Sequence, residues 1–238
     1  KITALASGAT SDAANVWFVG HPINLPGDQQ RQVFYDFKYV GVWQYADTLE
    51  MKKFNAKGST FKVGDPRAAD LNGDYKITAD SDRTFVGDTY PGWTASWSNR
   101  FTYKGFDLSG LIAAKWNYVF VDQTPRSYNG RFNNVADLDY WTPTNPTNKN
   151  PAPTTGAVDR LYASTRLYTD GSHWRIRNIT AGYTFSPRLA NRVGVQSVRV
   201  YGTAQDPYIH SSYIGIDPEV RGGVPTVRTL LIGSNVVF

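Results

Sequence analysis

The stretch WTASWSNRFTYKGFDLSGLIAAKWNY, residues 93–118, decides the fold class. In its first arm, 93–104, apolar and aromatic side chains recur at almost every second position, and Ser, Thr and Arg fill the positions between them. The apolar set of this arm consists of Trp93, Ala95, Trp97, Phe101 and Tyr103. Since successive side chains of a strand point to opposite faces, the alternation predicts a strand with one apolar and one polar face.

The second arm, 106–118, repeats this pattern after a short turn at Gly105. Its apolar set consists of Phe106, Leu108, Ile112, Ala114, Trp116 and Tyr118. Two alternating runs joined by a tight glycine turn predict an antiparallel hairpin. Each arm has about a dozen residues, whereas ordinary strands have about five or six and membrane-crossing strands need about ten.

Aromatic side chains gather near the ends of both arms, as in the girdles that membrane barrels place at the lipid headgroups. The hairpin therefore predicts strands whose apolar face contacts lipid. A large soluble β-protein with a two-layer core explains the alternation equally well. It explains less well why the apolar face is aromatic at both ends.

Further alternating segments are expected to form strands at 31–43, 173–185, 197–206 and 227–238. The last of them ends in TLLIGSNVVF, in which one face carries Leu230, Ile232, Val236 and Phe238. The opposite face is smaller and mostly more polar. We interpret this segment as another strand that faces lipid, and the alternative is a half-buried strand of a soluble sandwich.

The connections between these segments alternate in length. Those at Gly105 and 187–196 are short, whereas 44–92 and 119–172 each have about fifty residues. Short turns on one side and long loops on the other are typical of outer-membrane barrels. The sequence thus predicts an all-β fold, a transmembrane antiparallel β-barrel segment with long extracellular loops. Because lipid tolerates no open sheet edge, six or seven strands would have to be completed by others, and we expect the chain to be a fragment.

Composition excludes several classes of site. The chain has 238 residues and no cysteine, which excludes disulfides and thiolate metal sites. No apolar run approaches the roughly eighteen residues that a membrane-spanning helix needs. The net charge of +5 comes from scattered Lys and Arg, so we do not expect nucleic-acid binding. The three histidines lie in separate segments and no catalytic motif is present, so we do not expect an enzyme.

The motif DLNGDYKITADSD, residues 70–82, resembles a calcium-binding loop. Hard oxygen ligands at alternate positions suit Ca²⁺, and a backbone carbonyl serves at position 7. The candidate ligands are Asp70, Asn72, Asp74, the Lys76 carbonyl, Asp80 and Asp82. Two features depart from the pattern, because Ser81 stands at the twelfth position and Tyr75 at the sixth, where Gly is usual. The alternative is a turn in which Asp and Asn side chains bond their own backbone.

Two further groups of residues are candidates for contact with a ligand. Arg175 and Arg177 fall on one face of a strand; inside a barrel they would form an ion-pair ladder or touch cargo. The second long loop carries aromatic residues that could stack on sugars or pack the loop. These are Tyr128, Phe132, Tyr140 and Trp141. Substrate-binding residues cannot be named from sequence.

Five stretches resemble one family when taken together and in order. They are WFVGHPI (17–23), GDPRAADLNGDYKITADSDR (64–83), WTPTNP (141–146), RIRNITAGYTF (175–185) with VYGTAQDPY (200–208), and GIDPEV (215–220). They are similar to the C-terminal part of the SusC/RagA-type TonB-dependent outer-membrane transporters of Bacteroidetes. Mild departures are Asp206, where Asn is more common, and Tyr75, where Gly is usual.

The resemblance implies that residues 1–238 are the C-terminal part of a barrel of roughly 22 strands, without its plug domain. It also implies location in the outer membrane, energy supplied by TonB through the missing N-terminal part, and a SusD-like surface lipoprotein over the mouth. The expected function is import of oligosaccharides, with oligopeptides second. Two alternatives stay open: a secreted, calcium-stabilised β-sandwich that binds glycans, and a passive porin-like barrel.

Overall fold

The computed structural model describes residues 1–12, 14–21, 23, 33–122, 139–153, 167–213, 215–220 and 224–238. The chain divides into two compact units. Unit 1 comprises Lys1–Tyr90 and Val119–Thr169, and unit 2 comprises Pro91–Tyr118 and Asp170–Phe238. Unit 2 holds the hairpin 93–118 and the later strands, whereas unit 1 holds most of the two long connections.

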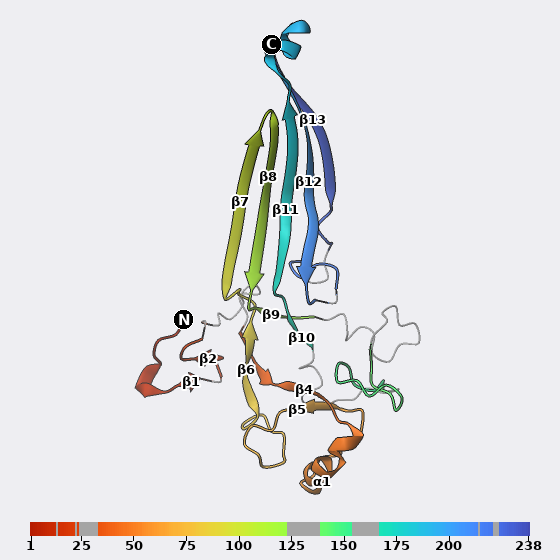
Figure 1. The fold of residues 1–238 in the computed structure, drawn as a ribbon. Coiled ribbons are helices and arrows are strands. Elements are labelled where there is room, and N and C mark those ends of the chain that lie inside the picture. Colours follow the sequence, from red (N-terminus) through yellow and green to blue (C-terminus); the bar gives the residue numbers. More distant parts are fainter. Residues whose placement is uncertain are drawn as a thin grey trace. The chain divides into compact units, whose positions relative to one another are not determined.

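Unit 2 is built on one sheet of five strands in the order β13-β12-β11-β8-β7 (Figure 1). Every neighbouring pair in it is antiparallel. The strands are β7 (Trp93–Tyr103), β8 (Phe106–Trp116), β11 (His173–Thr184), β12 (Ser197–Ser211) and β13 (Thr229–Val237). These bounds confirm the strands predicted in this part of the chain, and β12 extends further than 197–206.

The short connections of unit 2 lie at one end of the sheet. Tyr103 pairs with Phe106, which leaves Lys104 and Gly105 as a two-residue turn with φ values of 46° and 89°. Positive φ at both central residues is the geometry that matches the twist of a hairpin. The β11–β12 connection contains helix α3 (Pro187–Arg192), which begins at a proline after Ser186, as is common at a helix start.

The register places nearly all large exposed apolar side chains of the sheet on one face. Trp97 is 57% exposed and Ile232 is 94% exposed, although both would be buried in a two-layer sandwich. The exposed members of this face are Trp93, Trp97, Phe101, Tyr103, Phe106, Leu108, Trp116, Ile179, Val200, Tyr208, Leu230, Ile232 and Val236. An apolar surface of this extent marks an interaction with another apolar phase.

The opposite face of the same sheet is polar and internally bonded. The hydroxyls of Thr180 and Thr203 lie 2.8 Å apart. Arg199 binds Asp107 through two hydrogen bonds of 2.8 and 2.6 Å. The sheet is therefore two-sided, as the alternation in 93–118 predicts.

The described residues of unit 1 form four two-stranded sheets. They pair β1 (Ser11–Asp12) with β2 (Trp17–Phe18), β3 (Val33–Phe37) with β6 (Arg83–Asp88), β4 (Tyr39–Val42) with β5 (Pro66–Ala68), and β9 (Val119–Val121) with β10 (Tyr168–Asp170). The single strand predicted over 31–43 is thus two strands within its described part. The chain changes partner at Lys38, whose carbonyl accepts a bond from Ala69 N–H.

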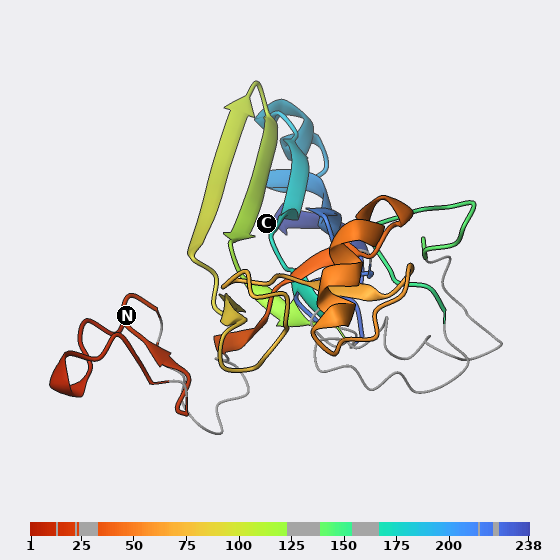
Figure 2. The same ribbon diagram turned by 90° about the horizontal axis from the view of Figure 1, so that it is seen from below.

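Unit 1 also contains short helices that the sequence does not predict: η1 (Ala6–Gly8), η2 (Tyr45–Asp47) and α1 (Thr48–Ala56). Figure 2 shows α1 in orange. In this helix only Met51 and Phe54 are buried, and they pack on a core with Trp43 and Phe61. Two buried positions in nine residues are too few to give a helical period. No helix of the described chain is long and apolar enough to cross a membrane.

Candidate functional site

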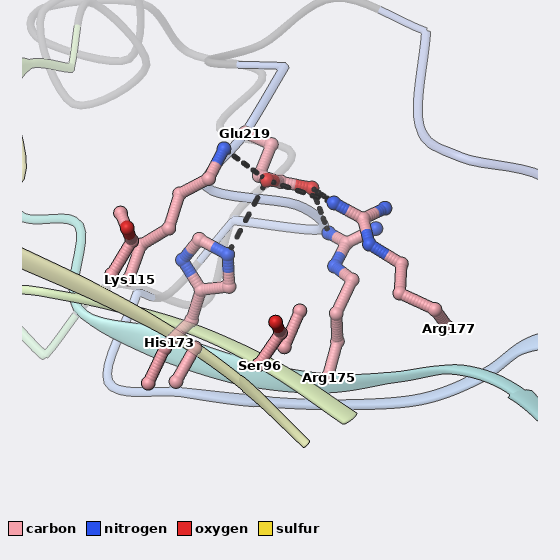
Figure 3. A pocket seen from close by; sticks show the side chains of 10 residues that line it. Ser96, Lys115, His173, Arg175, Arg177 and Glu219 are labelled. Atoms are coloured by element: carbon pink, nitrogen blue, oxygen red, sulfur yellow. Dashed lines mark hydrogen bonds and ion pairs between the residues drawn. The ribbon is translucent and has the colours of Figure 1, made fainter. Parts of the chain in front are cut away.

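A cluster of charged side chains lies on the polar face of the unit 2 sheet (Figure 3). Lys115 comes from the end of β8, and His173, Arg175 and Arg177 come from the start of β11. Glu219 belongs to segment 215–220, which follows β12. The antiparallel pairing of His173 with Lys115 brings these strand ends side by side. Figure 3 shows the carboxylate of Glu219 at the centre of the group.

The Glu219 carboxylate has four positively charged or imidazole neighbours. Lys115 Nζ lies 2.6 Å from Oε1, and His173 Nε2 lies 3.6 Å from the same oxygen. Arg175 Nη2 lies 3.2 Å from Oε2 and Arg177 Nη2 lies 2.9 Å from it. The imidazole of His173 and the ammonium of Lys115 hold the pKa of Glu219 well below its ordinary value of 4.5, against the opposing effect of partial burial.

Segment 215–220 is anchored by a second, more buried pair. Arg175 Nη2 donates to Asp217 Oδ1 at 2.6 Å, and these side chains are only 3% and 6% exposed. Asp217 also accepts from the backbone N–H of Glu219 and from the hydroxyl of Thr226, both at 2.9 Å. Burial raises the pKa of Asp217, but these bonds and Arg175 outweigh it and the pKa is lowered. Buried charges are tolerated when paired and hydrogen-bonded in this way.

An irregularity in the β11–β12 pairing shapes the site. The register of β11 shifts between Ile176 and Asn178 against both β12 and β8. Arg177 has no partner residue on β8, so it occupies a bulge, the kind of feature that redirects a side chain. On the facing strand, Asp206 has a φ of 46°. Asp206 Oδ1 lies 3.4 Å from Arg175 Nη1 and 3.3 Å from Arg177 Nη1. The ion-pair ladder, one of the two roles considered for these arginines, is therefore present.

His173 is held in a fixed orientation. Its Nδ1 lies 2.8 Å from the carbonyl of Gly171 and 3.2 Å from the hydroxyl of Tyr118. Because the imidazole is 1% exposed and Nδ1 has these two partners, Nε2 is directed at Glu219. The sequence singles out Arg175 and Arg177 but not His173, Lys115 or the two acids of segment 215–220. The only signal was the GIDPEV stretch, which carries the family resemblance.

The predicted calcium ligands lie elsewhere, in unit 1, and bond mainly to their own backbone. Asp70 accepts from Gly73 N–H at 2.7 Å and from Tyr75 N–H at 2.9 Å. Asp82 is fully buried, and it accepts from Leu71 N–H and Thr78 N–H at 2.9 and 2.8 Å.

The remaining candidates of this loop are exposed: Asn72, Asp74, Lys76 and Asp80. Asn72 and Asp74 again accept backbone N–H groups, at 3.1 and 2.7 Å. Tyr75 adopts a φ of 62°, the left-handed conformation for which Gly is usual at the sixth position. Among the described residues, no three His, Cys, Asp or Glu are grouped so that they could hold a metal ion. These contacts match the alternative of an Asx-bonded turn, and calcium binding stays a prediction.

The loop aromatics divide into two groups. Trp141 is 6% exposed and donates from Nε1 to Gln44 Oε1 at 2.8 Å, so it packs the loop. Tyr140 is exposed. Tyr128 and Phe132 lie outside the described residues.

Known proteins share both sequence and fold with this chain. The TonB-dependent receptor P3 of Formosa agariphila is 30% identical over 224 residues, which cover 86% of this chain and 22% of the receptor. The TonB-dependent receptor SusC of Bacteroides thetaiotaomicron is 32% identical over 161 residues, 64% of this chain and 15% of SusC. The chain belongs to the SusC/RagA-type TonB-dependent receptors. It spans about a fifth of the length of the relatives it matches.

The solved structures agree on the fold of this SusC/RagA-type segment. The RagAB peptide importer in its open-open state matches with a TM-score of 0.65 and 20% identity, over 99% of this chain and 25% of the RagAB chain. No protein-family model matches the chain. The all-β, antiparallel barrel segment predicted from the sequence is confirmed.

Proposed function

We propose that residues 1–238 form the C-terminal part of the barrel wall of an outer-membrane importer that draws its energy from TonB. The observation that carries this proposal is the two-sided sheet of unit 2. One face exposes Trp97, Phe101 and Ile232, which suits acyl chains, and the other buries the ion pairs of Arg175, which lipid would not tolerate. The relatives' names support the TonB-dependent class.

The cargo we propose is an oligosaccharide, captured together with a SusD-like surface lipoprotein. Short peptides are the second candidate, because the RagAB peptide importer has the same fold over this segment. The described relatives are receptors and transporters, and we propose no catalytic role for the chain. A secreted β-sandwich is a poorer explanation, since it would hide the exposed apolar face of the sheet.

Uptake by cells tests this proposal. A strain carrying the full-length transporter takes up a panel of labelled oligosaccharides, with a labelled peptide pool as the second arm. We expect uptake of at least one probe to require the transporter, and to stop when TonB is deleted or the inner membrane is de-energised. Uptake that persists without TonB would support the passive porin instead. No transporter-dependent uptake of either probe class would contradict import.

A further inference from the structure

The carboxylate of Glu219 lies where an external anion would bind. Four side chains from two neighbouring strands converge on it: Lys115, His173, Arg175 and Arg177 (Figure 3). Arg177 places one nitrogen 2.9 Å from Oε2 and 3.1 Å from Oε1. A hydrogen bond between two charged groups of this kind is about twice as strong as one between neutral groups. The donors come from the rigid sheet, whereas the acceptor comes from the segment that follows β12.

The charges of the cluster balance only when Glu219 is counted. Among the residues that the structure describes, three cations, Lys115, Arg175 and Arg177, face three carboxylates, those of Asp206, Asp217 and Glu219. Asp217 is committed to Arg175 at 2.6 Å, and Asp206 is shared at 3.3–3.4 Å by the two arginines. Without Glu219, three cations would face two carboxylates beside the imidazole of His173. That arrangement favours a bound anion.

The structure also has room and an unused donor beside Glu219. A pocket of about 240 Å³ borders the cluster, and Ser96 and Ala113 are among the small side chains that line it. Arg175 is 3% exposed, and its Nε lacks a hydrogen-bond partner among the residues that the structure describes. Arg175 itself lines the pocket. A buried guanidinium N–H without a partner is costly unless a further acceptor binds.

We propose that Lys115, His173, Arg175 and Arg177 form a binding site for a carboxylate of the cargo, which the chain's own Glu219 fills and for which cargo competes. The inference rests on the proposed importer function and narrows its cargo to acidic molecules. The carboxylate could belong to a uronic acid of an oligosaccharide or to a side chain of an acidic peptide. Competition of this kind weakens cargo affinity by the fraction of time the site is open.

The test measures binding to the full-length transporter in detergent by calorimetry. The probes are trigalacturonate, triglutamate and, as the neutral reference, maltotriose. The variant is Glu219→Gln, and the matched control is Glu50→Gln, which removes one negative charge from the Arg67 ion pair of unit 1. If Glu219 fills the site about nine tenths of the time, Glu219→Gln strengthens binding of an acidic probe about tenfold. The control and maltotriose binding stay unchanged, and the acidic probe that gains shows which source is used.

Two results would overturn the inference: acidic probes that bind no better to Glu219→Gln than to the unchanged protein, or an equal gain for maltotriose. A second measurement on the unchanged protein does not depend on how the variant folds. The backbone N–H groups of Glu219 and Val220 are bonded to Asp217, so their hydrogen exchange reports release of segment 215–220. We expect an acidic probe to make exchange at these two N–H groups faster and maltotriose to leave it unchanged. Equal exchange rates with and without the acidic probe would contradict displacement. Neither readout involves TonB, so failure here is distinct from failure of uptake.

Discussion

Replacing Ile232 by arginine should destabilise the barrel far more than replacing its neighbour Leu231. Both are large aliphatic residues near the middle of β13, and both are exposed, Ile232 at 94% and Leu231 at 46%. Their partners on β12, Gly202 and Thr203, show that they lie on opposite faces. Ile232 lies on the apolar face and Leu231 on the polar one, so position along the strand and residue type are matched while the face differs.

An arginine that faces lipid near the bilayer midplane costs about 2–4 kcal/mol, whereas a substitution on the inner face costs far less. Since about 1.4 kcal/mol corresponds to a factor of ten, Ile232→Arg should shift the folding equilibrium by about 30- to 700-fold. Leu231→Arg should stay within about 0.5 kcal/mol of the unchanged protein. The assay is equilibrium unfolding of the full-length transporter from lipid vesicles in guanidinium. Equal costs for the two variants, or a larger cost for Leu231→Arg, would refute the assignment of the faces.

Three further outcomes are expected. A Cβ added at Gly171 would clash with the ring of the buried Tyr118, whereas one at Gly202 meets nothing closer than 3.8 Å. Gly171→Ala should therefore lower the free energy of unfolding by about 1–3 kcal/mol, and Gly202→Ala should lower it by much less. Thermal unfolding of the two variants measures the difference. Because the pKa of Glu219 is lowered from 4.5, its ion pairs stabilise the fold above that pH and are lost as the pH falls through the folded-state pKa. The free energy of unfolding, measured across the acid range, should therefore decline as the pH falls, and Glu219→Gln should make this decline shallower. If the loop 70–82 binds Ca²⁺, millimolar calcium should raise the unfolding temperature and Asp74→Ala should abolish the rise; no shift in the unchanged protein would leave the Asx-bonded turn as the sole explanation.

The wall of the barrel could be predicted because its signal is local. Each arm of 93–118 alternates along its own length, and Lys104 and Gly105 supply the turn without reference to any distant residue. The split of 31–43 into β3 and β4 could not be predicted from the sequence, since it depends on distant partners. Strand β3 pairs with 83–88 and β4 pairs with 66–68. Helix α1 could not be predicted, because it buries only two side chains and these give no helical period.

The charged cluster could be predicted only in part for a related reason. The RIRN motif places two arginines on one face, but their partners are distant in the sequence. Glu219 lies 42 positions from Arg177, and the contact depends on the bulge between Ile176 and Asn178. Alternation alone reveals neither a bulge nor the path of segment 215–220. For the loop 70–82, the sequence shows the spacing of the candidate ligands, but only the structure shows that these side chains bond to backbone N–H groups.

The most direct test of the two-sided sheet is a cysteine scan along β13 (Thr229–Val237). Each position in turn carries a spin label, in the full-length transporter reconstituted in lipid. We predict that labels at 230, 232, 234 and 236 collide mainly with oxygen, which dissolves in lipid, and that labels at the positions between them collide mainly with a water-soluble nickel reagent. Accessibility without this period of two, or even-numbered positions shielded from both reagents, would contradict the account.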